Sequence, residues 1–169
     1  MTLPDTAFQG DTGHIADHNA IVDTLSDVLN ELSAYPTRTA GQGHITSLES
    51  TTSTSYADLA TPGPAVTVPL TAGQPVLILV NTRMWATTTG QYGYASFAVS
   101  GAASVAANDG DAIVMAQFSS AQDLSGTKPA IYVATITGDH TFTMKYRTTD
   151  AAKSVVFATR RIIVVPLLP

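Results

Sequence analysis

Residues 55–101 read SYADLATPGPAVTVPLTAGQPVLILVNTRMWATTTGQYGYASFAVSG, and they decide the fold class. Three runs in this stretch have the composition of strands: AVTVPL at 65–70, PVLILV at 75–80 and YASFAV at 94–99. The first and third alternate larger apolar residues with small or polar ones, which is the period of a half-buried strand. The second is apolar on both faces, so we expect it to be covered on both sides. Glycine and proline residues separate the runs and provide turns, and the stretch therefore predicts an antiparallel all-β domain.

The strand pattern continues beyond this stretch. The clearest run is TFTMKYR at 141–147, where every second residue is large and apolar. We predict that this strand points three side chains into the core, namely Phe142, Met144 and Tyr146. A final strand or pair of strands is predicted between 154 and 168, and Pro166 suggests that it ends at a sheet edge. About eight strands at this spacing predict a mainly β fold, an antiparallel, jelly-roll-like β-sandwich with an N-terminal arm and one helix.

Residues 13–33 predict the single helix, and its apolar positions form a stripe. The stripe consists of Ile21, Leu25, Val28 and Leu32, spaced four, three and four residues apart. Leucine at the first heptad position and isoleucine at the fourth disfavour dimers, so we predict self-association of this chain through these residues, as a homotrimer. The alternative is that the helix packs on its own β-domain, because short helices need tertiary support.

The chain divides into three parts by composition. Residues 1–35 form an extended arm and the helix, to which we assign anchoring or oligomerisation. Residues 36–54 contain many Gly, Ser and Thr residues and predict a linker. Residues 55–169 predict the β-sandwich head domain. Before Arg38 the chain has six acidic residues and no lysine or arginine, so the surface that receives this part is predicted to be basic or apolar.

The overall composition excludes several classes of partner. Charged residues make up 12% of the chain, against about 25% in ordinary soluble domains. Low charge with many small residues is typical of sandwiches that pack against copies of themselves. The net charge of −5 argues against a nucleic-acid partner, which needs a basic stripe. The apolar runs are far shorter than the ~20 residues of a membrane helix, so no membrane insertion is expected.

A pair of histidines is the one candidate for a metal site. His14 and His18 are four residues apart and share a helix face, and in a parallel trimer they would form layers on the axis. The third ligand and the supporting hydrogen bonds of a typical site are missing, so we expect these histidines to cap the helix seam or to form hydrogen bonds with neighbours, and to hold no metal.

No catalytic constellation stands out in the sequence. There is no G-x-S-x-G motif, no glycine-rich phosphate loop and no pair of carboxylates on strands, so we expect neither an enzyme nor a cofactor. Three aromatic residues near a Gly- and Thr-rich hairpin are candidates for stacking on a glycan: Trp85, Tyr92 and Tyr94. The more common role of such residues in a β-domain is packing in the core or at a subunit interface.

Four short segments carry a resemblance to known proteins: YADLATPGPAVTV at 56–68, YASFAVSGA at 94–102, TFTMKYR at 141–147 and RRIIVVPL at 160–167. They resemble a β-domain that recurs in virion proteins of phages infecting actinobacteria, at the C-terminal end of minor tail or fibre-like proteins. The resemblance covers roughly residues 52–169. It implies a structural protein that is made in the host cytoplasm and displayed on the exterior of the particle, with contacts to other virion proteins through residues 1–35.

Two other roles remain open from the sequence. A capsid fibre or decoration protein needs the same short anchor and β-head as a tail protein does. A carbohydrate-binding module, which recognises a glycan of the host surface, belongs to a different class and would use the exposed aromatic residues of the head domain.

Overall fold

The computed structural model describes residues 12–34, 40–117 and 123–167, and it separates the chain into a helical unit and a β-domain. The helical unit contains α1 (Thr12–Ala34), close to the predicted bounds. The predicted arm, residues 1–12, lies outside the described residues except for Thr12. The described part of α1 has no stretch apolar enough and long enough to cross a membrane.

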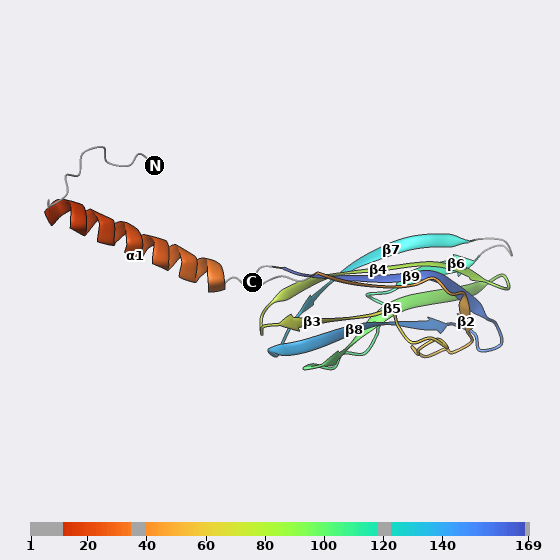
Figure 1. The fold of residues 1–169 in the computed structure, drawn as a ribbon. Helices are drawn as coiled ribbons and strands as arrows, with labels where there is room; N and C mark the ends of the chain where they lie inside the picture. Colours follow the sequence, from red (N-terminus) through yellow and green to blue (C-terminus); the bar gives the residue numbers. More distant parts are fainter. Residues whose placement is uncertain (1–11, 35–39, 118–122, 168–169) are drawn as a thin grey trace. The chain divides into compact units, whose positions relative to one another are not determined.

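The β-domain is an antiparallel sandwich of two sheets (Figure 1). The first sheet has the strand order β1-β9-β4-β7, with β2 also paired to β9, and the second sheet has the order β3-β8-β5-β6. This arrangement confirms the mainly β, jelly-roll-like fold, with nine strands over the described residues. Their bounds are β1 (Gly41–Ile45), β2 (Glu49–Thr51), β3 (Ala65–Leu70), β4 (Pro75–Ala86), β5 (Gln91–Gly101), β6 (Ile113–Gln117), β7 (Leu124–Val133), β8 (Gly138–Thr148) and β9 (Val155–Pro166).

The core lies between the two sheets and is filled by alternate residues of each long strand. Strand β8 shows the pattern most clearly, because its inward side chains are fully buried and its outward ones are partly exposed. Phe142, Met144 and Tyr146 each have 0% exposure, so the predicted register of this strand is confirmed. The Phe142 ring packs edge-on against Tyr132 of β7, with 5.4 Å between ring centroids, and thereby joins the two sheets.

The sequence predicts that residues 36–54 are a linker. The structure corrects this, because the segment contains β1 and β2. Both strands pair with β9 and extend the first sheet beyond it. Their side chains alternate only weakly, with two glycines in β1, so the residues carry little strand signal. Gly43 is needed there because a Cβ atom at this position would lie 2.8 Å from the backbone oxygen of Ala65. Close packing against β3 therefore selects glycine, which on sequence alone resembles a coil residue.

One further expectation about a strand was wrong. The run 75–80 within β4 is buried on one face only, because its other face is the outer surface of the first sheet. Strand β9 lies between β1 and β4 over most of its length. Within the described residues the pairing of β1 with β9 ends at Gly41 and Val164, before the proline, which agrees with the predicted edge position of Pro166.

Candidate functional site

An arginine on the outer face of the second sheet lies against two tyrosine rings. Arg147 is the outward neighbour of the buried Tyr146 on β8, and it is the register partner of Tyr94 on β5. Its guanidinium carbon is 3.7 Å from the ring centroid of Tyr94 and 5.4 Å from that of Tyr56. Both distances fall in the range in which the negative face of an aromatic ring attracts a cation.

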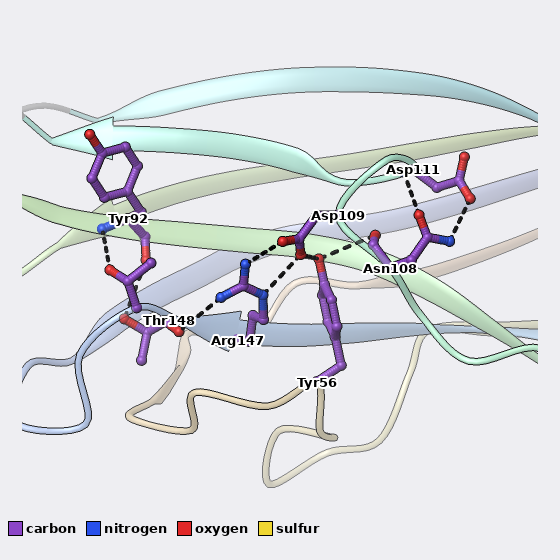
Figure 2. A network of polar contacts seen from close by, with 8 residues as sticks. Tyr56, Tyr92, Asn108, Asp109, Asp111, Arg147 and Thr148 are labelled. Atoms are coloured by element: carbon purple, nitrogen blue, oxygen red, sulfur yellow. Dashed lines mark hydrogen bonds and ion pairs between the residues drawn. The ribbon is translucent and has the colours of Figure 1, made fainter.

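A carboxylate completes this arginine cluster, which we define as Tyr56, Tyr94, Asp109 and Arg147. Figure 2 shows Asp109 between Arg147 and Tyr56. Arg147 donates from Nε and Nη2 to the two oxygens of Asp109, at 3.0 and 2.7 Å. The Tyr56 hydroxyl donates to Asp109 Oδ1 at 2.8 Å. The hydrogen bonds from Arg147 and Tyr56 lower the pKa of Asp109, whereas burial and the charge of Asp109 raise the pKa of Tyr56.

The cluster holds the loop between β5 and β6 over the second sheet. Asn108 and Asp111 close the tip of this loop, since the Asn108 amide donates to Asp111 Oδ2 at 2.8 Å. Ser96 belongs to the outward set of β5, together with Tyr94, and yet it has 0% exposure. All three guanidinium nitrogens of Arg147 are engaged, because Nη1 also donates to the Thr148 carbonyl at 3.4 Å. The arrangement therefore positions a loop, and it contains no nucleophile paired with a base.

The three aromatic residues that the sequence singles out do not form one site within the chain. Tyr92 and Tyr94 are two residues apart on β5 and share the outer face of the second sheet. Tyr92 is 39% exposed, whereas Tyr94 packs on Arg147. Trp85 lies on β4, on the outer face of the first sheet, where Arg83 covers its ring at 5.3 Å and pairs with Asp123. Glycan stacking on all three at once is therefore excluded for a single domain.

The predicted residues of α1 are described only in part. Leu25 and Val28 are 55% and 50% exposed, and Ile21 is partly exposed. His18 is exposed as well, while the side chains of His14 and Leu32 lie outside the described residues. In the described part of the chain, no group of three or more potential ligand side chains is close enough to hold a metal ion.

The sequence does not predict the buried ion pair between Glu49 and Arg160. Strand β9 contains an irregularity in its register with β4, and Thr159 adopts a positive φ of 49° at this point. This bulge turns Arg160 inward, where it is fully buried and lies 5.7 Å from the ring centroid of Tyr146. Arg160 Nη2 is 3.3 Å from Glu49 Oε1, and the Glu49 side chain is 12% exposed.

Neighbouring groups form hydrogen bonds with both members of this pair, whereas Arg160 Nε has no hydrogen-bond partner in the described part of the chain. Arg160 donates to Ser47 Oγ at 3.0 Å and to the Thr61 carbonyl at 3.3 Å. The Thr61 amide in turn donates to Glu49 Oε2 at 2.8 Å. The ion pair therefore fixes the segment between β1 and β3 onto β9. Sequence signals for it are slight: Arg160 shares the buried parity of Ile162 and Val164, and a lone glutamate stands in a Ser- and Thr-rich stretch.

We expect acid to remove the stabilisation that Glu49 provides. Burial by itself raises the pKa of this carboxyl, but hydrogen bonds from Thr61 and Ser47 and the charge of Arg160 outweigh it and lower the pKa from 4.5 to about 2. A lowered folded-state pKa means that the contribution is complete above pH 4.5 and disappears as the pH falls towards 2. Urea unfolding of the natural chain and of Glu49→Gln at several pH values measures this. The difference between them should shrink in that window, and a difference independent of pH would contradict the assignment.

Comparison with known proteins supports the fold and nothing finer. No family model matches the sequence, and no curated protein is similar enough to count as a relative. Among solved structures, Eiger TNF from S. frugiperda is 14% identical, with a TM-score of 0.51, over 78% of this chain and 93% of that one. A structure of infectious bursal disease virus, Gt strain, is 10% identical, with a TM-score of 0.50, over 77% of this chain and 33% of that one. The chain thus spans about a third of the viral protein chain it matches.

Proposed function

We propose that this chain is a structural, non-enzymatic protein of a phage virion, a homotrimeric minor tail or fibre-like protein displayed on the outside of the particle. One observation carries the proposal: a jelly-roll domain with its own core is joined to a separate helical unit whose described apolar side chains are exposed. A head domain with its own core needs no such helix for folding. The helix is therefore available for attachment to other chains.

The helix has the properties of an attachment segment. Leu25, Val28 and Leu29 are between 50% and 62% exposed, which is costly for a helix that stays alone in water. Leu25 at the first heptad position and Ile21 at the fourth favour three or four copies over two. Before Arg38 there are acidic residues and no basic ones, so a basic or apolar surface on another virion protein suits this segment.

The resemblance of four segments to virion proteins of actinobacterial phages supports this role. The structural likeness to a viral protein fits it, although a likeness at 10% identity extends only to the fold. A capsid fibre or decoration protein would use the same two units, and it is the first alternative. Localising the labelled protein on purified virions by electron microscopy distinguishes tail from capsid.

A carbohydrate-binding module is the alternative of a different class, and one observation favours it. Tyr92 presents an aromatic ring on the outer face of the second sheet, 39% exposed, next to Tyr94. Such a ring can stack on a sugar. A glycan array or a cell-wall pull-down with the β-domain tests this role. Retention that is lost in Tyr92→Ala but kept in Trp85→Ala would support it, since the two rings lie on opposite outer faces.

We predict that residues 38–169 fold without the helical unit but do not join virions. The truncation should begin at Arg38, because a start near Ser50 would remove β1 and also Glu49, the partner of Arg160. The test supplies either this fragment or the full chain, each tagged, to particles assembled without the natural protein. A cooperative thermal melt with less than ~10% of normal incorporation is the expected result, since the buried core residues of the described chain all belong to the β-domain.

Two outcomes would contradict this prediction. Normal incorporation of the fragment would remove the anchoring role of the helix. Absence of the tagged full chain from purified virions would overturn the proposed function itself, whatever its oligomeric state in solution.

A further inference from the structure

The outer face of the first sheet is apolar at one end. Strand register places Leu77 of β4 between Ile131 of β7 and Val165 of β9, and it places Leu79 beside Ile163. These side chains belong to the outward set of each strand, because their chain neighbours are the buried ones. Together with Val133 they form a surface that we call the apolar face.

The apolar face is accessible in the single chain. Ile131 is 60% exposed and Val133 is 51% exposed, and the β4 and β9 members are partly exposed. A patch of this kind amounts to roughly a few hundred Å2, a size that on monomers often marks an interaction site. It contains no charged residue, and polar side chains bound it on the next register row, at Asn81, Thr127 and Arg161.

The two outer faces of the sandwich differ in this respect. The loop that the arginine cluster holds covers part of the second sheet, where Ser96 has 0% exposure, and the exposed Tyr92 and Val114 of this face reach only 39% and 43%. In the first sheet, β7 is the edge strand (Figure 1). Its side chains Ile131 and Val133 are both more than half exposed. Exposed apolar residues on a long edge strand favour association with another chain, and natural proteins usually avoid them.

We propose that the apolar face is the contact through which β-domains of this chain pack on one another. An uncharged face cannot form ion pairs with a charged partner. Two copies of it can pack together without like-charge repulsion. The chain also enters the domain here, since Gly41 of β1 pairs with Val164, between Ile163 and Val165.

The short connection between α1 and β1 favours a second copy of this chain as the partner of the apolar face. Only residues 35–40 separate α1 from β1, a connection that reaches about 25 Å when fully extended. Helices that associate therefore keep their β-domains at high effective concentration. This argument rests on the self-association in the proposed function, and it names the surface of the β-domain that takes part.

The test compares charge insertion on the two opposite outer faces of the β-domain, in the full chain. Ile131→Lys with Val133→Lys alters the apolar face. Val114→Lys on β6, 43% exposed on the outer face of the second sheet, is the matched control. Sedimentation equilibrium should show that the control assembles as the natural chain does, whereas the double variant has a dissociation constant at least ~100-fold higher. The positions are exposed, so the thermal midpoint should stay near that of the control.

A milder pair guards against failure to fold. Ile131→Thr with Val133→Thr keeps the branched shape that suits a strand, and it should weaken association by roughly 10-fold. An unchanged dissociation constant in both double variants overturns the inference and leaves the helix as the carrier of assembly. A natural chain that stays monomeric at millimolar concentration also overturns it, while incorporation into virions still decides the proposed function separately.

Discussion

Replacing Glu49 with glutamine is expected to lower the free energy of unfolding by about 3–5 kcal/mol at pH 7. The change leaves the guanidinium of Arg160, which has 0% exposure, without its countercharge. An uncompensated charge between two sheets is far more costly than a missing hydrogen bond. Urea denaturation followed by circular dichroism measures the difference.

Two further variants show whether the buried charge is the cause. Glu49→Gln combined with Arg160→Met removes both charges, and we expect it to regain most of the loss, because apolar replacements of buried ion pairs are often neutral. Asp58→Asn breaks the more exposed pair with Lys145, at 2.7 Å, and should cost about 1 kcal/mol or less. Equal losses in Glu49→Gln and Asp58→Asn would show that water screens Arg160.

Replacing Phe142 with alanine is expected to cost about 3–5 kcal/mol, because the side chain is fully buried and the space it leaves cannot collapse easily. Its ring packs against Tyr132 and also against Phe97, with 6.1 Å between the latter centroids. The loss therefore affects both sheets and should appear as a lower urea midpoint with an unchanged slope.

The neighbouring residue on β8 provides the control. Thr143 points outward and is partly exposed, so Thr143→Ala should change the free energy of unfolding by about 1 kcal/mol or less. Comparable losses at the two positions would contradict the assignment of inward and outward residues on this strand.

The local features of the fold were predictable from the sequence. The inward residues of β8 follow from the two-residue period, and the extent of α1 follows from its apolar spacing. Both patterns are properties of a short segment, which the segment displays whatever its neighbours are. The same holds for the turn at 108–111, where an asparagine, two aspartates and a glycine stand together.

Features that depend on distant pairing were not predictable. The position of β9 inside the first sheet is set by β1 and β4, neither of which is its neighbour in sequence. Trp85 and Tyr92 are close in sequence, yet the chain crosses from one sheet to the other between β4 and β5, so they lie on opposite outer faces. The burial of Arg160 depends on a bulge and on Glu49, and neither leaves a local pattern.

The position of β9 also sets the order of events during synthesis. This strand is the last of the described strands to leave the ribosome, yet β1, β2 and β4 all pair with it. Until β9 is made, β1 lacks the strand with which it pairs, and one side of β4 is open. A neighbouring nascent chain can then supply the missing strand by exchange. Ile163 and Val165 also come from β9, so the surface proposed for assembly is incomplete on an unfinished chain. Partly made copies would thus be unable to take a place among finished ones.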